Sequence, residues 1–436
     1  MFRSLAVRNY RLWFGGALVS NTGAWMQRIA QDWLVLTQLT DDDATAVGLT
    51  MALNFAPQLL LVPLTGVVAD RFNRRTILFI TQIAMALLGL GLGILTVTGV
   101  VQLWMVFAFA LGLGLASAFD APVRQAFVSE LVPADKLANA VSLNAVSFNM
   151  ARLVGPAVAG LLVAALGSGP VFLINSASFV GVFLALALLR RSEFETFTRP
   201  KRGNGLRDGF RYVRGRPDIM LVMVLVFLMG TFGFNFSVFL ATMARVEFDR
   251  DADVFGVLSS VLAVGSIAGA LLAARRERPR LRTIALAGLG FGVGLGAGAL
   301  APNIYLFGAT LVVTGFCSLT MMTTANAYVQ TTTRPSMRGR VMALYLAIFL
   351  GGTPLGAPVV GLVADSLGPR YALGVGMLAG FLSAAIAAIF YVRTREVKVR
   401  FVRRRWPLRL EYGASARDRE LATTEIAIVE AETQRT

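Results

Sequence analysis

Long apolar stretches constrain the fold of this chain more than any other feature of its sequence. A helix needs roughly 20 mostly apolar residues to cross the hydrocarbon core of a bilayer. Twelve segments of this kind follow one another along the chain, separated by polar stretches. Their approximate limits are 12–37, 46–69, 76–98, 101–122, 138–166, 170–189, 219–243, 254–274, 282–301, 303–328, 340–364 and 371–392. The sequence therefore predicts an all-α membrane protein with twelve transmembrane helices.

Composition narrows the class of function. Hydrophobic residues make up 56% of the 436 residues and charged residues 15%, whereas soluble domains are about half apolar and about a quarter charged. Histidine is absent, and Cys317 is the single cysteine. A chain without histidine has no His metal ligand and no Ser-His-Asp triad, and one cysteine forms no intrachain disulfide. We therefore expect no enzymatic activity, no metal site and no cofactor.

Basic residues gather in alternate loops, and this bias predicts an orientation. With the N-terminus in the cytoplasm, the outer loops hold only Arg245, Arg250 and Arg370, and nearly all other Lys and Arg residues lie in cytoplasmic segments. Acidic residues show the opposite bias, as in the outer run 41–43. We expect both termini in the cytoplasm. The formal net charge of +16 is then a topology signal with contacts to anionic lipids, and no nucleic acid partner is expected.

A polar, arginine-rich loop divides the spans six and six. Within it, Leu206, Phe210 and Val213 recur at helical spacing among arginines. This pattern fits either an amphipathic helix on the inner leaflet or a solvated linker. The tail passes from basic to acidic and is predicted to be mostly disordered. The predicted domains are an N-terminal bundle 1–189, a cytoplasmic linker 190–218, a C-terminal bundle 219–392 and a cytoplasmic tail 393–436.

The two halves resemble each other. Glycines of the fifth span recur in the eleventh at a constant offset of 201 residues: Gly155, Gly160 and Gly167 correspond to Gly356, Gly361 and Gly368. Two six-helix halves related by such a repeat are typical of secondary transporters. The chain contains no GxxxxGK[ST] phosphate-binding motif. Transport would therefore depend on a gradient.

The loop after the second span carries GVVADRFNRR, from Gly66 to Arg75. This stretch resembles the signature G-x-x-x-D-R-x-G-R-R/K of the major facilitator superfamily, with Asn73 where glycine is usual. Asn tolerates left-handed backbone, so we expect the tight turn to be retained. The resemblance implies two pseudo-symmetric six-helix bundles and a gating motif that braces the cytoplasmic end, formed by Gly66, Asp70, Arg71, Arg74 and Arg75.

The same resemblance implies roles for single residues of this motif. Asp70 would lie near the start of the eleventh span, and Gly66 would permit close helix approach. Asp120, at the inner end of the fourth span, is the expected acidic partner of the motif arginines. The alternative is that these arginines are only topology charges.

Three further stretches narrow the resemblance to one branch. NTGAWMQRIAQDWLVLTQLT, FDAPVRQAFVSELVPADKLANAVSLN and RPSMRGRVMALY resemble the enterobactin-exporter-like branch of the superfamily, over about residues 1–395. The resemblance implies a monomeric exporter of drug- or siderophore-like amphipathic small molecules in a bacterial cytoplasmic membrane, working by alternating access. The alternatives are an importer or lipid-flipping transporter on the same fold, and a non-transporting scaffold or receptor.

Polar residues inside the spans are candidate site residues, because charges within a membrane usually face a cavity or a partner. Helical spacing places Asn21, Trp25, Arg28 and Asp32 on one face of the first span. The resemblance implies that this span lines the central cavity. The candidate substrate or proton site comprises Asn21, Arg28, Asp32, Asn144, Arg152 and Asn235. The structural alternative is an ion pair of Asp32 with Arg152 or Arg28.

The fifth span also contains GPAVAG, in which Gly155, Pro156 and Gly160 predict close helix packing. This segment resembles the end of the antiporter motif of drug/proton exporters, but its upstream glycines are missing. The fourth span also lacks the basic residue usual in those exporters. Asp32 is the acid that lies well inside a predicted span. It is therefore the candidate proton carrier if transport is coupled to protons.

Overall fold

Helices make up almost all of the described chain. The computed structural model describes residues 3–61, 64–65, 68, 72–190, 193–194, 205–274, 279–395, 398–401 and 408–411. The long helices of the N-terminal half are α1 (Arg8–Leu34), α2 (Ala44–Leu60), α4 (Arg74–Val97), α5 (Leu103–Phe127), α6 (Ala134–Leu166) and α7 (Ser168–Leu188). Those that follow are α8 (Gly205–Arg214), α9 (Pro217–Leu228), α10 (Phe236–Thr242), α11 (Ala252–Ala274), α12 (Leu281–Ala299), α13 (Ile304–Thr332), α14 (Pro335–Leu367) and α15 (Pro369–Arg395).

Short elements complete the chain. The 3-10 turns are η1 (Arg3–Ala6) and η3 (Val128–Glu130), and the π-helical turns are η2 (Val35–Leu39), η5 (Met229–Gly233) and η6 (Met243–Glu247). Strands β1 (Lys398–Phe401) and β2 (Leu408–Glu411) pair antiparallel. This hairpin lies in the tail that was predicted to be mostly disordered, so the fold is nearly, but not entirely, all-α.

The predicted membrane-protein fold is confirmed. The described residues of each of the twelve apolar segments lie mostly in helices, and nine helices in the described part of the chain are long and apolar enough to cross a membrane. The seventh segment, predicted as one continuous span, is interrupted: α9 runs into η5, and α10 begins only after a non-helical stretch at residues 234–235. The domain limits and the cytoplasmic position of both termini stay predictions.

The sequence repeat corresponds to a structural repeat. Helices α6 and α14 both contain 33 residues. Each ends at a glycine with left-handed backbone, where φ is 83° at Gly167 and 107° at Gly368, a conformation that glycine adopts without steric cost. In addition, η2 and η6 each precede an aspartate with positive φ, Asp42 and Asp249. The two halves therefore repeat the same backbone features in the same order.

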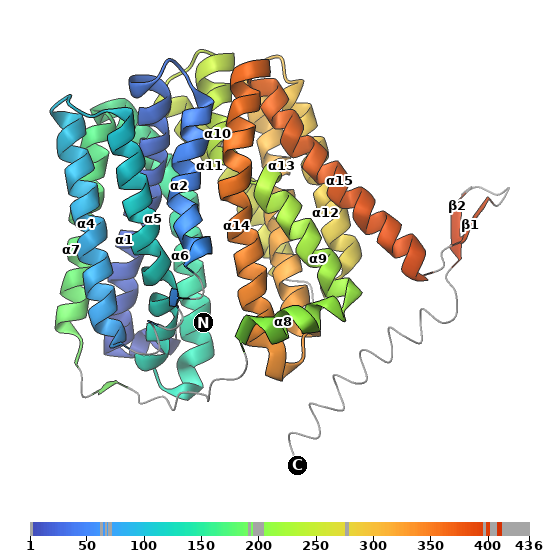
Figure 1. Cartoon of the computed structure of the whole chain (residues 1–436), viewed down its shortest axis with the longest axis horizontal. Helices are drawn as coiled ribbons and strands as arrows, with labels where there is room; N and C mark the ends of the chain where they lie inside the picture. Colours follow the sequence, from blue (N-terminus) through green and yellow to red (C-terminus); the bar gives the residue numbers. More distant parts are fainter. Residues whose placement is uncertain are drawn as a thin grey trace.

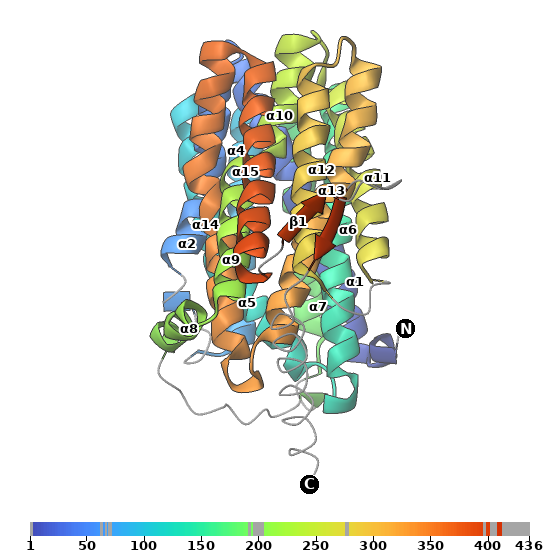
Figure 2. The same ribbon diagram turned by 90° about the vertical axis from the view of Figure 1, so that its right-hand side faces the viewer.

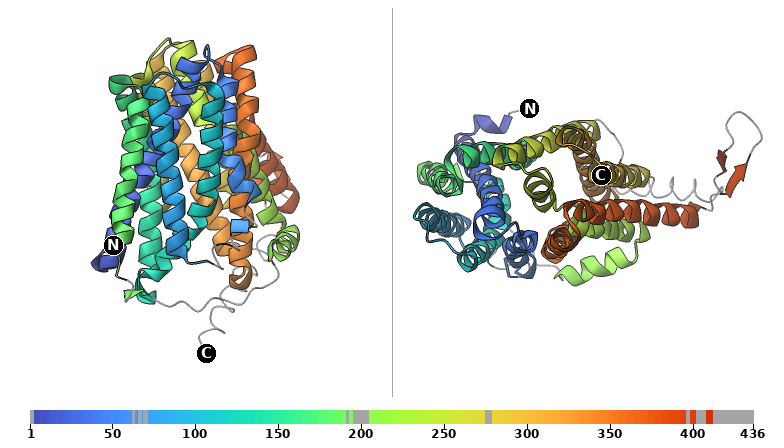
Figure 3. Two further views of the ribbon diagram at one scale, coloured as in Figure 1. Left: turned by 60° about the vertical axis from the view of Figure 1, so that its left-hand side comes forward. Right: turned by 90° about the horizontal axis from the view of Figure 1, so that it is seen from above.

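The halves lie side by side, with α1, α2 and α4–α7 in one group and α9–α15 in the other (Figure 1). The right-hand view of Figure 3 looks along the helices and shows that the groups meet where α6 packs on α11 and where α2 packs on α14. Toward the lower end of Figure 1 the ribbons of the two groups move apart. The upper end is therefore the joined end of the molecule.

Glycines allow this close approach. A side chain on Gly48 would collide with the Ala357 carbonyl oxygen, and one on Gly361 would collide with the carbonyl oxygen of Ala44. At the second contact, a Cβ on Gly256 would lie 2.8 Å from the Cα of Gly160. The α2–α14 and α6–α11 contacts thus depend on backbone-to-backbone packing.

An aromatic contact and the packing of helix α8 add further contacts at the two ends of the molecule. At the joined end, the Trp33 ring stacks on Phe255, with centroids 5.5 Å apart. At the opposite end, Figure 2 shows α8 beneath the long helices. Val213 of α8 is buried, and Asp208 forms a 3.6 Å salt bridge with Arg340 of α14. The linker thus contains a helix packed on α14, and its contact with a membrane surface stays a prediction.

Candidate functional site

Two arginines and three aromatic rings meet between α1, α2 and α6. The Arg28 guanidinium lies 5.0 Å from the ring centroids of both Trp25 and Phe55. The Arg152 guanidinium lies 5.7 Å from the same Trp25 ring, which Phe148 contacts edge-on at 6.0 Å. We call these five residues the arginine–tryptophan site. Of the five, Phe55 was missed, because an isolated phenylalanine in an apolar span carries no sequence signal of contact with an arginine.

Local sequence explains how α6 comes so near to α1. Gly155 lies one turn after Arg152, and a Cβ at Gly155 would lie 2.6 Å from the Cβ of Trp25. The absence of a side chain therefore allows the two helices to pack closely enough for both guanidiniums to reach one indole ring. Pro156 lies inside α6, which remains helical around it.

The charges of the two arginines are not neutralised by neighbours. Within the described part of the chain, neither guanidinium forms a hydrogen bond or a salt bridge; both make cation–π contacts. The two cations are close enough to repel each other. A charge within a membrane costs ~2.5–3.5 kcal/mol on insertion scales, and a cation–π contact returns only ~0.5–2 kcal/mol. This arrangement is costly unless a further group balances the charge.

The predicted ion pairs of Asp32 are wrong for this structure. Among the described residues, Asp32 forms no salt bridge with Arg28 or Arg152, although it attracts Arg28 at longer range. Arg28 instead turns toward the rings of Trp25 and Phe55. Asp32 is 3% exposed and lies on α1, which packs against α10 of the opposite half, near Ser237. A single serine in a phenylalanine-rich stretch gave no sequence signal of this proximity.

Asn235 lies in the interruption of the seventh span. Its side chain is fully buried, and its Nδ2 donates a 2.7 Å hydrogen bond to the Thr231 carbonyl. Its Oδ1 has no partner in the described part of the chain. The α14 backbone packs closely against η5, since a Cβ at Gly352 would lie 2.6 Å from the Thr231 nitrogen. Interrupted helices often mark binding sites in transporters.

The two remaining candidate asparagines occupy different surroundings. Asn21 Oδ1 accepts a 3.5 Å hydrogen bond from Arg124 Nη1, so Asn21 belongs to a charged network of α5. Asn144 is half-buried on α6, one turn before Phe148, and its side chain has no hydrogen bond within the described residues. The six candidate residues therefore do not gather at one place.

Asp120 is the centre of that α5 network. Its carboxylate forms a 2.8 Å salt bridge with Arg124 and accepts hydrogen bonds from Thr81 at 2.9 Å and Gln82 at 2.7 Å. Asp120 is 5% exposed. The prediction that it pairs with the gating-motif arginines is wrong for Arg74. Arg124 stands four residues along the same helix and reaches the carboxylate first.

The gating motif is described in part. Gly66, Asp70 and Arg71 lie outside the described residues. Arg74 forms a 2.9 Å salt bridge with Glu130, and Arg75 donates to the Leu186 carbonyl. Asn73 does not adopt the expected left-handed backbone, because its φ is −66°. Its Oδ1 instead accepts from the backbone nitrogens of Arg75 and Thr76 and caps α4.

At the joined end, polar contacts link the halves. Asp365, at the end of α14, accepts hydrogen bonds from the backbone nitrogens of Ala44 at 2.7 Å and Thr45 at 2.8 Å. It therefore caps the first turn of α2 from the opposite half, where a carboxylate is favoured. Arg245 also forms a 3.3 Å salt bridge with Asp42. We call these contacts, together with the glycine contacts of α2–α14 and α6–α11, the upper gate.

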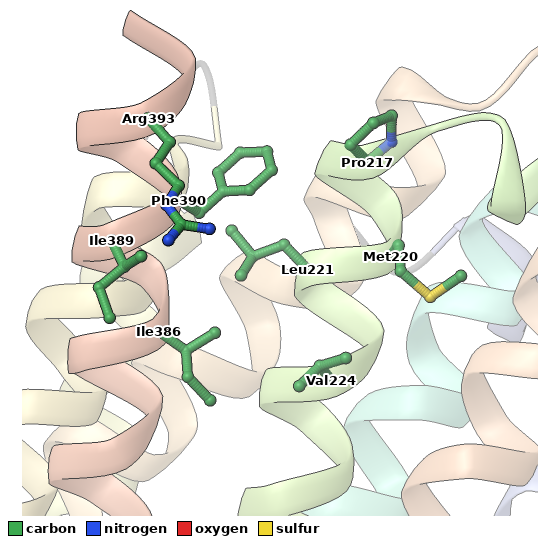
Figure 4. Close-up of a pocket in the computed structure, with 8 residues that line it drawn as sticks. All are labelled: Pro217, Met220, Leu221, Val224, Ile386, Ile389, Phe390 and Arg393. Atoms are coloured by element: carbon green, nitrogen blue, oxygen red, sulfur yellow. The ribbon is translucent and has the colours of Figure 1, made fainter. Parts of the chain in front are cut away.

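A groove lies elsewhere, between α9 and α15. It has a volume of about 520 Å³, and Figure 4 shows apolar side chains of both helices along it, with Arg393 on α15. None of the candidate residues lines it.

Near the start of this groove, two hydrogen bonds with Asp218 raise the pKa of the Arg216 guanidinium. Among the described residues, no three His, Cys, Asp or Glu side chains gather as a metal site.

Sequence comparisons identify relatives along nearly the whole chain. The family model described as "Transmembrane secretion effector" matches residues 2–422. The staphyloferrin A transporter of Staphylococcus aureus is 24% identical over 89% of this chain and 97% of its own length. The multidrug efflux pump Tap of Mycolicibacterium fortuitum is 26% identical over 87% and 95%. Macrolide efflux protein A of Streptococcus pyogenes is 22% identical over 89% and 96%.

Solved structures support the fold. A bacterial homologue of the lysosomal transporter Spinster superposes with a TM-score of 0.65 at 17% identity, over 88% of this chain and 96% of that chain. A D-xylose–proton symporter superposes with a TM-score of 0.68 at 14% identity, over 88% and 97%. At such low identity, the likeness establishes the backbone arrangement and nothing finer.

Proposed function

The chain belongs to the transmembrane secretion effector family of major facilitator transporters, and on that basis we propose that it exports amphipathic small molecules from the cytoplasm. Three relatives of this chain are named as transporters or efflux proteins for siderophores, drugs or macrolides. One structural observation supports transport most directly. The halves are joined at the upper gate, while two charged side chains without ionic partners lie between helices of the N-terminal half.

The joined end supports transport by alternating access. With both termini in the cytoplasm, the upper gate faces outward, so the molecule is in the state that loads cargo from the cytoplasm. Transport then requires the upper gate to open and the opposite end to close. In that second state, the gating motif around Asp70 and Arg74 would hold the cytoplasmic end together.

Direction can be tested with inverted membrane vesicles. We expect vesicles that contain the protein to accumulate drug-like compounds which are first selected by a toxicity screen in a host with and without the protein. Accumulation in right-side-out vesicles instead would mean import. Movement of labelled phospholipid alone would mean lipid flipping, and no flux of any compound in either orientation would favour a scaffold or receptor.

We further propose the proton as the coupling ion, with Asp32 as its carrier. Asp32 is a buried acid on α1, which packs against α10 of the opposite half, so its protonation can affect how the halves meet. The test is substrate-induced proton movement in proteoliposomes. We expect Asp32→Asn to abolish it, whereas the exposed Asp135→Asn serves as a charge-matched control. Coupling that persists in Asp32→Asn excludes Asp32 as the carrier, and a wild type without proton movement points to another driving ion.

A further inference from the structure

We propose that the arginine–tryptophan site binds the carboxylate or phosphate group of an amphipathic anion, whose apolar part packs against Phe55 and Phe148. The inference rests on the proposed function, because it names the chemical class of the transported molecule. It concerns a defined place: two guanidiniums from α1 and α6 over one indole ring.

The geometry suits an anion with a planar acceptor group. Each guanidinium presents a fork of N–H donors that matches the two oxygens of a carboxylate or phosphate. Arg28 and Arg152 both lie over the Trp25 ring, so their donors are confined to one small region. The ring faces contact the cations, and the N–H groups have no hydrogen-bond acceptor among the described residues.

Unused apolar surface lies next to these donors. Phe148 packs on Trp25 but is 47% exposed, and Phe55 is half-buried beside Arg28. A ligand with an anionic group and an adjoining aromatic or aliphatic part can therefore use both kinds of contact. This combination defines an amphipathic anion rather than an inorganic ion.

The local charge balance also favours an anion. Asp32 attracts Arg28 from beyond salt-bridge distance, and this attraction exceeds the repulsion that Arg152 exerts on Arg28. Among the described residues, no acid forms a salt bridge with Arg152, so its charge is the less balanced of the two. A cationic cargo would add a third positive charge, whereas an anion would relieve the repulsion. Binding of a neutral cargo would leave the donors unsatisfied.

Two other arginines of this chain form salt bridges with carboxylates. Arg124 pairs with Asp120 at 2.8 Å, and Arg370 pairs with Glu247 at 2.7 Å. Arg124 also lies over the Trp13 ring, 5.6 Å from its centroid. Arg28 and Arg152 have the aromatic rings without a carboxylate at salt-bridge distance among the described residues, and a ring holds a cation in place without neutralising it. An incoming anion completes the same kind of pair that Asp120 and Arg124 form internally.

The test compares two probes that differ in charge. The full-length protein in neutral phosphatidylcholine nanodiscs is titrated with 1-naphthylacetate and with the uncharged 1-naphthylacetamide. We expect the acetate to bind about ten-fold tighter. Equal affinity of the two probes for the wild type overturns the proposal without any variant.

Variants then locate the site. We expect Arg28→Gln and Arg152→Gln each to reduce the charge preference to about two-fold, and Arg152→Lys to retain part of it, because lysine keeps the charge but not the fork. Arg393→Gln, in the groove of Figure 4, is the matched control and should keep the wild-type preference. Preference that survives both Gln variants, or is lost in Arg393→Gln, overturns the assignment.

A competition arm identifies the source of the anion. Displacement of naphthylacetate by phosphatidylglycerol identifies a lipid headgroup, and the absence of displacement identifies a soluble molecule; either result requires the anion site. The outcome is also separable from transport. If the protein exports neutral compounds and shows no charge preference, the proposed function stands and the anion site is wrong. If it binds the acetate selectively but exports nothing, the anion site stands and the proposed function is wrong.

Discussion

Buried charged residues of this chain differ in how their charge is balanced. The carboxylate of Asp120 is surrounded by donors from Arg124, Thr81 and Gln82. By contrast, Arg28 and Arg152 lie over aromatic rings and form no salt bridge with a described residue. The first arrangement stabilises the folded N-terminal half, and the second leaves charge available to a ligand. Single substitutions should separate these two roles.

Asp120→Asn should destabilise the protein. The substitution leaves Arg124 buried without its counter-charge, and breaking a buried pair in this way costs ~3–5 kcal/mol. We expect a clear fall in the thermal unfolding midpoint of the purified protein, measured by static light scattering or intrinsic fluorescence. The exposed Asp135→Asn removes the same charge as a control. An unchanged midpoint in Asp120→Asn would contradict the buried role of this pair.

Two double-mutant cycles test whether Asp32 and Arg152 interact energetically. Because no salt bridge joins them in the described structure, the stability effects of Asp32→Asn and Arg152→Gln should add to within ~0.5 kcal/mol. The cycle of Asp120→Asn with Arg124→Gln should instead show a coupling energy of ~1–3 kcal/mol. Strong coupling in the first cycle would restore the ion pair that the sequence predicted.

At this scale, sequence reasoning found residues but not their partners. Helical spacing correctly placed Trp25 and Arg28 near each other, one turn apart on α1. The partner of Arg28 depends on a side-chain direction and on Phe55 of another helix, and neither follows from spacing. The spacing of four residues between Asp120 and Arg124 is compatible with the observed salt bridge. The resemblance to the superfamily signature instead favoured the arginines of the gating motif as partners of Asp120.

Among the elements, α2–α14 and α6–α11 are repeats of one contact. Gly160 and Gly361 stand at equivalent positions of the two halves, and both allow a partner backbone to approach closely. The upper gate therefore contains two equivalent helix contacts, each with a glycine at the closest approach. Both contacts must separate for the upper end to open.

Gly160→Leu should prevent this end from closing normally. A leucine there would collide with Gly256 of α11, so the joined state loses stability and transport falls severely. Gly15→Leu is the control, because Gly15 has no atom within 4 Å of an added Cβ. Transport rates in proteoliposomes, normalised to folded protein, provide the measurement. Wild-type rates for Gly160→Leu would show that the α6–α11 contact does not limit the cycle.

Element positions were predictable because helix length and apolar content suffice to locate a membrane span. The interruption at residues 234–235 was not predictable from the same information. It accompanies close packing of Gly352 and Gly356 of α14 against Thr231, a contact between segments more than a hundred residues apart. The capping of α2 by Asp365 was missed for the same reason.

For the whole molecule, the joined upper end corresponds to one of the two states that the proposed alternating access requires. Each half has its own internal helix contacts, and among the described residues the main contacts between the halves are α2–α14 and α6–α11. A covalent link across the upper gate should therefore hold the protein in this state.

Thr45→Cys with Asp365→Cys provides such a link. Both residues lie at the upper gate and are hydrogen-bonded in the joined state. In a Cys317→Ala background, a short bifunctional thiol reagent that reductant can cleave should abolish transport, and reductant should restore it. Each single cysteine variant treated in the same way controls for modification alone. Undiminished transport by the cross-linked protein would mean that the upper gate does not open during the cycle.

The unpaired arginines have an electrical consequence. A cargo that leaves as an anion moves negative charge out of a cell whose interior is negative. Each elementary charge that crosses gains about 2.3 kcal/mol per 100 mV of membrane potential. Export through this protein would then generate current and draw on voltage even where no proton gradient exists. Clamping the potential to zero with potassium and valinomycin would slow such export more than it slows export of a neutral cargo in the same vesicles, because the anion moves one more charge per cycle.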